Sequence, residues 1–238
     1  MTDKTVLITG CSSGIGECVA RGLSGRGYRV LATARQADDV ARLENSGLES
    51  FLLDVSDADS VSAAVDETLS RTGGTLYGLF NNGAYGQPGA VEDLTRDVLC
   101  EQFETNFFGW HDLTRQLLPV MRRQGYGRII QNSSVLGFVA LAFRGAYNAS
   151  KYALEGLTDT LRLELRGTDI HVCLVQPGPI TSRFRPNAYL AYQRNIDPLV
   201  SVHRERYEGM EQRLKKAGPV VPFTLPPEAV LKKVIHAL

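Results

Sequence analysis

The sequence predicts an α/β protein built on one doubly wound parallel sheet with helices on both faces, the arrangement known as the Rossmann fold. Six short apolar runs rich in β-branched residues alternate with helical patterns along the chain. The first run leads into a glycine-rich loop and then a helix. The 238 residues show no linker and no repeat, so we expect a single domain over 1–238.

The expected elements follow one another in regular order. The strands are predicted at 5–9, 28–34, 51–55, 76–80, 127–132 and 170–175. The helices are predicted after the glycine loop, at 38–43, from 56, from 95 through 106 and after a bend to 121, at 146–165, and from 227 to 238. Ligands bind at the carboxyl ends of the strands in sheets of this kind, which is where the site should form.

Composition excludes several classes of protein. The 26 Lys and Arg balance the 26 Asp and Glu, which argues against a nucleic-acid-binding protein. No apolar run approaches the length of a membrane span, and the N-terminus enters a strand directly, so we expect a cytoplasmic protein without a signal peptide. The cysteines lack metal-binding or CxxC spacing, which predicts reduced, mostly buried thiols and no metal site: Cys11, Cys18, Cys100 and Cys173.

The glycine loop, between the first strand and the first helix, is a candidate phosphate-binding site. Gly10 would permit the tight turn, Gly14 would let the backbone approach a pyrophosphate, and Gly16 would let the helix pack on the strand. The N-terminus of the helix then offers amide groups and a positive dipole end to the phosphates. A plain glycine-rich turn is the alternative.

The end of the second strand bears on which dinucleotide would bind. A dinucleotide fold that prefers NAD usually places an acid there, whereas this sequence has Ala34-Arg35. The Arg35 guanidinium could bind a 2′-phosphate bidentately, and Ser12 and Ser13 of the glycine loop could add hydroxyl contacts. The alternative for Arg35 is an ordinary surface arginine.

Tyr147 and Lys151 are the central candidates for chemistry. They lie four positions apart on an expected helix and share one face. An ammonium about 4 Å away would favour the phenolate by about 4 kcal/mol at an effective dielectric near 20. That is roughly three pKa units, enough to bring a phenol from its usual pKa near 10 towards neutrality. Ser134, at the end of the fifth strand, could hold the same substrate oxygen. Chance helix surface is the alternative.

Three other polar or aromatic residues need an interpretation. Asn106 lies mid-helix, where asparagine is unfavourable unless its side chain has a partner. His171 falls within the sixth strand and is interpreted as a packed or edge histidine. Trp110 is interpreted as a packing residue.

With these residues in place, the chain resembles the classical short-chain dehydrogenase/reductases over residues 4 to about 181. Thr9-Gly10-x-x-x-Gly14-x-Gly16 is similar to the family's cofactor motif, and Asp54 to its adenine-contacting aspartate. Asn106, Ser134, Tyr147 and Lys151 match its catalytic tetrad, and Pro177-Gly178 with Thr181 match the segment that holds the nicotinamide amide. Asn81-Asn82-Gly83-Ala84 departs from the usual Asn-Asn-Ala-Gly, so the turn after the fourth strand could differ.

The resemblance implies roles for the matched residues. Tyr147 would be the general acid for reduction and the general base for oxidation, with Ser134 orienting the substrate oxygen. Lys151 would lower the tyrosine pKa and bond the nicotinamide ribose, and Asn106 would hold a water in line with Lys151. The residues expected to hold NADP(H) are Gly10, Ser12, Ser13, Gly14, Ile15, Gly16, Arg35, Asp54, Val55, Asn82, Gly83, Tyr147, Lys151, Pro177, Gly178, Ile180 and Thr181.

Residues 182–222 mix aromatic and charged side chains and match the family's substrate lid. Their aromatics favour an apolar substrate, although helices packed on the body would give the same pattern. Family members add a seventh strand after the helix that begins at about 227, so the sequence is either truncated or lacks that edge strand. The resemblance also implies a homodimer or homotetramer through helices 107–121 and 147–165. The apolar positions at helical spacing, some of which must face their own sheet, are Leu113, Leu117, Leu157 and Leu161.

The leading hypothesis is therefore an NADP(H)-dependent oxidoreductase acting on an apolar aldehyde, ketone, steroid or retinoid. The stretch from Asn82 to Asp93 resembles the branch with retinol and 17β-hydroxysteroid dehydrogenases and bacterial aldehyde reductases. A catalytically weak, cofactor-sensing regulatory protein on the same fold is the alternative from another class. An epimerase or dehydratase is a third, although nothing marks a sugar-nucleotide site.

Overall fold

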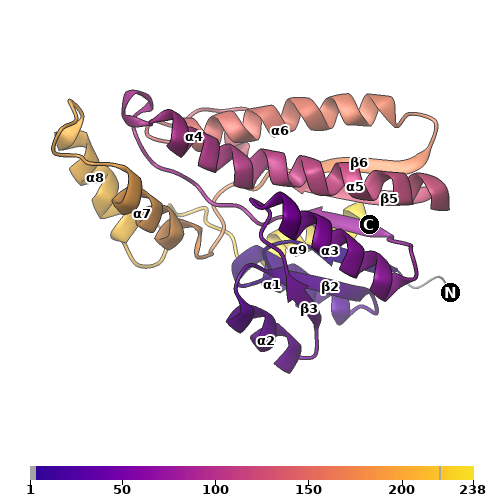
Figure 1. Ribbon diagram of the computed structural model, residues 1–238. Helices are drawn as coiled ribbons and strands as arrows, with labels where there is room; N and C mark the ends of the chain where they lie inside the picture. Colours follow the sequence, from indigo (N-terminus) through magenta and orange to yellow (C-terminus); the bar gives the residue numbers. More distant parts are fainter. Residues whose placement is uncertain (1–3, 220) are drawn as a thin grey trace.

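Six parallel strands form the centre of the protein. The computed structural model describes residues 4–219 and 221–238. In these residues the strand order is β3-β2-β1-β4-β5-β6, so the chain starts in the middle of the sheet and winds outward in both directions (Figure 1). The strands are β1 Thr5–Ile8, β2 Arg29–Ala34, β3 Glu49–Leu52, β4 Gly78–Asn81, β5 Tyr126–Asn132 and β6 Asp169–Val175.

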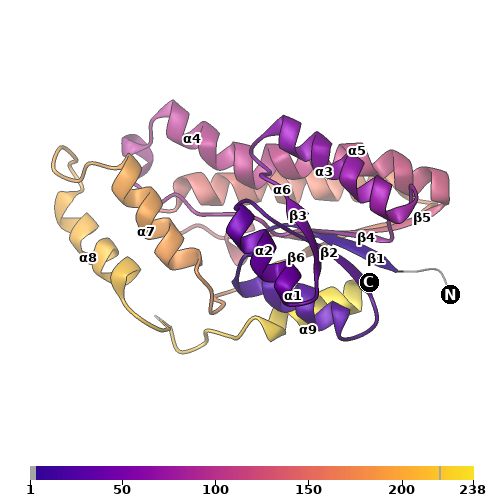
Figure 2. The same ribbon diagram turned by 60° about the horizontal axis from the view of Figure 1, so that its bottom comes forward.

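Helices cover both faces of the sheet, as the alternation of strand and helix patterns predicts. One face carries α1, α2 and α9, and the other carries α3, α5 and α6 (Figures 1 and 2). The α-helices are α1 Gly14–Ser24, α2 Ala37–Asn45, α3 Ala58–Thr72, α4 Arg96–Phe103, α5 Gly109–Gln124, α6 Gly145–Glu164, α7 Phe184–Asn195, α8 Arg204–Lys215 and α9 Glu228–Ala237. The doubly wound fold class is confirmed.

One apolar core lies on each side of the sheet. Leu7, Leu79 and Ile129 point from the strands towards α3, α5 and α6, while Ile8 and Phe80 point towards α1, α2 and α9. Neighbouring residues of a strand face opposite sides, so β1 supplies both cores from consecutive positions. The near-continuous burial of β1, β2 and β4 is what a parallel sheet covered on both faces requires.

The bounds of all six strands differ from the expected ones, and the difference exceeds one residue at β3 and β4. The third strand was expected at 51–55, but β3 ends at Leu52, and the Asp54 N–H bonds the Ser60 hydroxyl at 2.9 Å. This bond turns the chain into the start of α3. The fourth strand was expected from 76, but the Gln124 side chain satisfies both the N–H and the carbonyl of Leu76. Strand β4 therefore begins at Gly78.

The expected helix with a bend is present from α4 to α5. A π-helical segment, Glu104–Phe108, joins the two α-helices and contains the buried Asn106. Helix α5 begins at Gly109, where a Cβ would lie only 1.7 Å from the Val55 carbonyl oxygen. A side chain at this position would push α5 away from the loop after β3.

The segment expected to form a lid consists of α7 and α8, which lie next to each other beyond the sheet (Figures 1 and 2). They share a small apolar cluster of Ala188, Tyr192, Ile196, Tyr207 and Leu214 that also includes Ala90 from the body. Leu225 then forms a parallel bridge with Ile180, and α9 returns to pack on α1.

Burial decides several other expectations. Leu113 and Leu117 are fully buried in the core beneath α5, so they are among the interface candidates that face their own sheet. Cys11 is buried but Cys100 is exposed, so the thiols are only in part the buried groups expected; all four cysteines are free. His171 is exposed on β6, an edge strand of the described sheet.

In the part of the chain that the structure describes, no helix combines the length and apolar character that a membrane crossing requires.

Candidate active site

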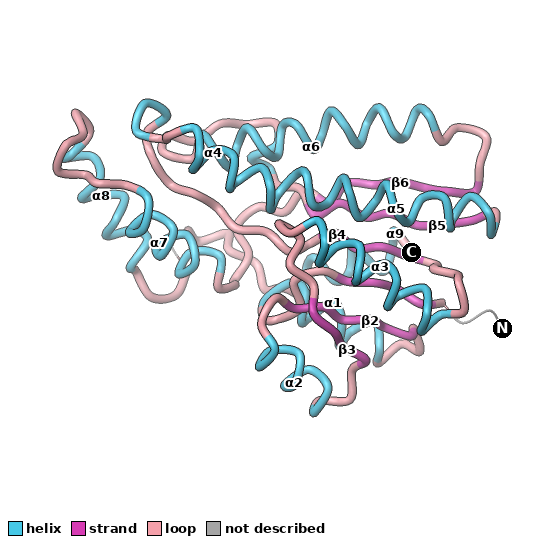
Figure 3. The backbone as a smooth tube through the Cα atoms, in the orientation of Figure 1, coloured by secondary structure: helices cyan, strands magenta, loops and turns pink. Residues whose placement is uncertain are grey.

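The candidate site lies at the carboxyl ends of the strands, where their loops gather between the sheet and helices α7 and α8 (Figure 3). The glycine loop follows β1, Asn82 and Gly83 follow β4, and Ser134 follows β5. Helix α6 brings Tyr147 and Lys151 to the same edge from the face that carries α3 and α5.

The glycine loop has the backbone geometry that its sequence predicts. Gly10 and Gly14 have φ angles of 70° and 60°, in the left-handed region that glycine adopts without strain. A Cβ on Gly16 would lie 2.2 Å from the Gly10 carbonyl oxygen, so only glycine lets α1 start this close to β1. The described Ser13 side chain makes no capping hydrogen bond, which leaves the first amides of α1 available to an anion. The loop therefore fits a dinucleotide pyrophosphate.

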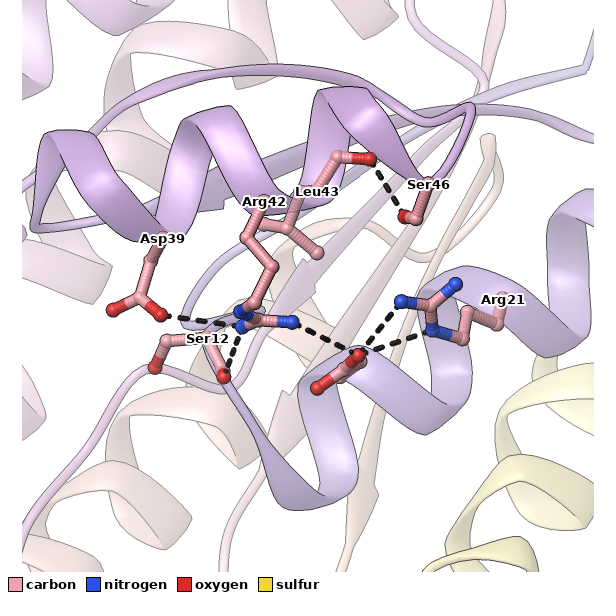
Figure 4. A network of polar contacts seen from close by, with 7 residues as sticks. Ser12, Arg21, Asp39, Arg42, Leu43 and Ser46 are labelled. Carbon is pink, nitrogen blue, oxygen red and sulfur yellow. Dashed lines mark hydrogen bonds and ion pairs between the residues drawn. The ribbon is translucent and has the colours of Figure 1, made fainter.

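Arg42, which lies on α2, stabilises the glycine loop through hydrogen bonds (Figure 4). Its Nη2 donates to the Ser12 carbonyl oxygen at 2.5 Å and to Asp39 at 3.2 Å, and its Nη1 donates to Glu17 at 3.1 Å. The same Glu17 carboxylate accepts two bonds from Arg21 on α1. Arg42 thus joins α1, α2 and the loop through charge-assisted bonds, a role that no motif in the sequence indicates.

A second network joins the ends of β1, β4 and β5. The Thr9 hydroxyl accepts the N–H groups of Asn82 and Gly83, both at 2.8 Å. The Asn82 side chain donates to the carbonyls of Thr9 and Gly10 and accepts a bond from the Asn132 amide at 2.9 Å. The turn Asn81-Asn82-Gly83-Ala84 thereby holds the glycine loop in place despite its departure from the usual sequence.

Lys151 is 1% exposed, and its ammonium has two contacts that the sequence analysis did not anticipate. Nζ donates to the Asn132 carbonyl oxygen at 2.9 Å and lies 4.1 Å from the centre of the Trp110 ring. Burial lowers the pKa of Lys151 to about 7, with Glu155 acting in the opposite direction. Trp110 is more than a packing residue, because its ring faces a cation and its Nε1–H donates to the Gly83 carbonyl at 2.8 Å.

The expected electrostatics of Tyr147 are corrected by the structure. Lys151 Nζ lies 5.8 Å from the tyrosine ring centre and donates to Asn132. Burial raises the pKa of Tyr147 to about 12, and the interactions that oppose this rise are a hydrogen bond with Ser134 and the charge of Arg144. Desolvation formed no part of the sequence expectation, and its effect on the pKa of Tyr147 exceeds that of the two opposing interactions. The convergence of Ser134 with Tyr147 is as expected.

Asn106 has partners that explain a buried asparagine within a helix. Its amide accepts the Tyr85 N–H at 3.2 Å and donates to the Tyr85 carbonyl at 2.9 Å. It also donates to the Ser150 hydroxyl on α6 at 3.4 Å. The π-helical segment thus fixes the loop after β4 to the helix that carries Tyr147.

The segment after β6 crosses the site from the glycine loop to Tyr147. The Pro177 carbonyl accepts the Val135 N–H at 3.0 Å, next to Ser134. The Thr181 N–H is bonded to the Leu225 carbonyl, so it is not free for a ligand. Ser182 lies against Gly14, and the Phe184 ring packs edge-on against Tyr147 with 5.2 Å between ring centres. The Pro177 carbonyl thus lies next to Ser134, and Ser182 lies next to the glycine loop. The cofactor contacts expected of Pro177, Gly178, Ile180 and Thr181 stay a prediction.

The remaining predicted cofactor residues lie at the ends of β2 and β3. Arg35 is exposed directly after β2. Asp54 follows β3 and accepts bonds from the backbone and hydroxyl of Ser56 at 3.0 and 2.7 Å. Val55 is buried against Gly109. No group of metal-ligating side chains occurs among the described residues.

Comparison with known proteins identifies the family. The model of the short chain dehydrogenase family matches residues 4–193. The chain belongs to the classical short-chain dehydrogenase/reductase family. An uncharacterized oxidoreductase of Escherichia coli K12, YbbO, is 43% identical over 234 residues, which cover 98% of this chain and 81% of YbbO. Human retinol dehydrogenase 16 is 40% identical over 185 residues, or 75% of this chain and 57% of the relative.

Solved structures of short-chain dehydrogenases superimpose over nearly the whole chain. A member from Burkholderia phymatum in complex with NAD has a TM-score of 0.83 and 24% identity, covering 98% of this chain and 85% of that one. A variant of the actinorhodin polyketide ketoreductase with NADPH has a TM-score of 0.79 and 28% identity, covering 99% and 90%. The protein is thus an oxidoreductase of this family whose structural neighbours bind nicotinamide cofactors.

The burial of Lys151 predicts a pH dependence of stability. Between its native pKa of about 7 and the ordinary value of 10.5, the unfolded chain binds a proton that the native chain does not. Stability contributed by this group therefore rises with pH in that window, by at most about 1.4 kcal/mol per pH unit. The free energy of unfolding of the wild type should rise relative to that of Lys151→Met between pH 7 and 10, as measured by urea denaturation.

Lys232→Met, on the exposed surface of α9, is the matched control for the loss of a lysine charge. A difference between the wild type and Lys151→Met that stays constant from pH 7 to 10 would show that Lys151 is not strongly desolvated in the native state.

Proposed function

We propose that the protein is an NADP(H)-dependent oxidoreductase that transfers a hydride between nicotinamide and an apolar aldehyde, ketone or alcohol. The observation that carries the proposal is the convergence of Ser134, Tyr147 and Lys151 beside a glycine loop with phosphate-binding geometry. The catalytically weak regulatory alternative is not favoured, because the chain has both the tyrosine and the lysine.

The chain's own residues would move and hold the proton. In reduction the Tyr147 hydroxyl gives its proton to the substrate oxygen, and in oxidation the tyrosine takes it back. The Ser134 hydroxyl donates to the same oxygen and stabilises the charge that develops on it. The cofactor, when bound, supplies or accepts the hydride. Lys151 and Tyr147 would contact the nicotinamide ribose, and the amides that begin α1 would hold the pyrophosphate.

The substrate class follows from the lid that we propose for residues 182–222. Phe184 presents an aromatic ring to Tyr147, and Tyr189 and Tyr192 lie on the same helix. A carbonyl compound that reaches Tyr147 must contact or displace the Phe184 ring, which favours an apolar body next to the reacting carbon.

Tyr147→Phe should abolish turnover while leaving NADPH affinity nearly unchanged, because the ring still packs on Phe184 but the proton donor is gone. Turnover is followed at 340 nm with a panel of aldehydes, ketones and retinoids, and NADPH binding by fluorescence titration. Tyr152→Phe, a half-exposed tyrosine on the same helix, is the matched control. Retention of most of the activity in Tyr147→Phe would remove the tyrosine from its role.

Cofactor choice is predicted from Arg35. The strand ends in Ala34 and not in an acid, so no carboxylate at this position opposes a 2′-phosphate. One charge-assisted contact is worth about 1.5–3 kcal/mol, or about tenfold to a hundredfold in affinity. The value of kcat/KM should favour NADPH over NADH by that factor.

The double variant Ala34→Asp, Arg35→Leu should reverse the preference, because the new carboxylate would repel the phosphate and accept the 2′-hydroxyl of NADH. Arg123→Leu, an exposed arginine on α5, controls for the loss of surface charge. Equal kcat/KM values with the two cofactors in the wild type would show that Arg35 is only a surface residue.

We also propose a symmetric homodimer through the outer surfaces of α4, α5 and α6. Exposed apolar side chains on and between these helices include Leu99, Phe108, Tyr152 and Leu163. Of the four leucines expected from the sequence, Leu113 and Leu117 face the core, whereas Leu157 and Leu161 are partly buried. Light scattering at micromolar concentration should give a dimer or a multiple of it, and Phe108→Glu should lower the mass towards that of one chain. A wild-type monomer would contradict the proposal.

A further inference from the structure

One face of helix α6 holds the loop that carries Ser134. The Asn148 amide donates to two carbonyl oxygens of this loop, at 3.1 and 2.7 Å, and Lys151 Nζ donates to a third, that of Asn132, at 2.9 Å. Asn148, Lys151 and Glu155 are three and four positions apart, so they follow one another along the same face. Glu155, the third member of this row, has no role in the sequence motifs or in the proposed chemistry.

The short 3-10 turn Val135–Gly137 directly follows Ser134 and fixes it. The Ser134 hydroxyl oxygen accepts the Leu136 N–H at 3.1 Å, and the Gly137 N–H donates to the Ser134 carbonyl at 2.8 Å. Any displacement of this turn would therefore move the serine hydroxyl away from the substrate oxygen that we assign to it.

Glu155 packs against this turn at Gly137. A Cβ on Gly137 would lie only 2.9 Å from Cγ and from Oε1 of Glu155, and 2.9 Å from the Ser133 hydroxyl oxygen. The absence of a side chain at Gly137 thus gives the carboxylate its place. Glu155 Oε1 and Ser133 Oγ border the same small space, one residue away from Ser134 in the chain.

Both of these oxygens are withdrawn from water. Neither Glu155 Oε1 nor Ser133 Oγ has a hydrogen-bond partner among the described residues, and Ser133 is 4% exposed. Buried polar atoms are costly unless they are hydrogen-bonded. A carboxylate accepts and a hydroxyl donates, so the two groups can satisfy each other, either directly after a small rotation or through one shared water. The geometry thus favours Glu155 and Ser133 as an interacting pair.

The other carboxylate oxygen of Glu155 reaches the loop after the neighbouring strand. Gln176, which directly follows β6, donates from Nε2 to Glu155 Oε2 at 2.7 Å. The next residue, Pro177, accepts the Val135 N–H at 3.0 Å. The carboxylate therefore connects the loop that carries the serine with the segment that we expect to contact the nicotinamide.

We propose that Glu155 is a positioning residue, whose carboxylate holds the Ser134 loop on α6 and connects it to the turn at Pro177, so that the serine hydroxyl stays directed at the substrate oxygen. This inference rests on the proposed function, which assigns Ser134 to that oxygen. The charge of Glu155 also acts on Lys151, one helical turn earlier. The experiment therefore has to separate position from charge.

The first measurement is kcat with NADPH and the aldehyde that the wild type reduces fastest. Glu155→Ala should lower kcat about tenfold or more, the effect of one lost bond to a charged group, and leave the affinity for NADPH unchanged. Glu155→Gln keeps an acceptor for Gln176 and a polar group beside Ser133, so it should retain most of the activity. Glu164→Ala, an exposed glutamate on the same helix, is the matched control.

An unchanged kcat in Glu155→Ala would overturn the inference. A loss in Glu155→Gln as large as that in Glu155→Ala would also overturn it, because the charge and not the position would then matter.

The Ser134→Ala background separates positioning of the serine from every other effect. Loss of this donor alone should slow the chemical step about a hundredfold to a thousandfold, which single-turnover kinetics with excess enzyme can follow. Glu155→Ala then has no hydroxyl left to misplace, so the double variant should be as fast as Ser134→Ala. Effects through Lys151 or through general stability would instead multiply with that of Ser134→Ala, and this result would contradict the inference.

Amide hydrogen exchange tests the same contacts without turnover. Peptides that cover 133–139 and 176–181 should exchange roughly tenfold faster in Glu155→Ala than in the wild type, whereas peptides from α3 should not change and so confirm the fold. Gln176→Ala, at an exposed position outside the core, should speed exchange in 176–181. Unchanged exchange of both segments in Glu155→Ala would overturn its role. A wild type that reduces no carbonyl compound with either cofactor would count against the proposed function instead.

Discussion

The buried ammonium of Lys151 is the group on which the geometry of the site depends. Its bond to the Asn132 carbonyl fixes the end of β5, and the Asn132 side chain continues the connection to Asn82 and from there to Gly10. Trp110 belongs to the same network, because its ring packs against the Lys151 amino group and its Nε1–H donates to the Gly83 carbonyl. A buried polar group is costly unless it is hydrogen-bonded. These contacts therefore place helix α6 and the glycine loop relative to each other.

The sequence predicted which residues meet, because the rules that place them are local or topological. The carboxyl ends of parallel strands lie at one edge of the sheet, and residues four positions apart share one helix face. These two rules predict that Ser134, Tyr147 and Lys151 lie close together. The end of β3 could not be placed, because it depends on a bond from Asp54 to Ser60 in the next helix. The contact of Trp110 with Lys151 joins two helices whose relative rotation no sequence pattern specifies.

Electrostatics is the property that the sequence predicts least well. The spacing of Tyr147 and Lys151 places an ammonium near a phenol, but it says nothing of how far folding removes both groups from water. The structure adds opposed effects, since burial raises the pKa of Tyr147 while a hydrogen bond with Ser134 and the charge of Arg144 act against that rise. Arg144 carries no motif of its own. Phe143 carries no motif either, although its left-handed backbone and contacts with α8 fix the chain just before α6.

The pKa shifts of Tyr147 and Lys151 have a joint meaning. Burial raises the first to about 12 and lowers the second to about 7, so it favours the neutral form of both groups. A neutral tyrosine with a neutral lysine holds the same number of protons as a phenolate with an ammonium, so the pair can exchange one form for the other without taking a proton from solvent. Hydrogen-bond acceptors brought to Lys151 stabilise the ammonium, and donors brought to Tyr147 stabilise the phenolate. Ligands that supply both contacts would therefore shift the pair towards the charged form only when the site is occupied, which would couple the proposed proton transfer to substrate and cofactor binding.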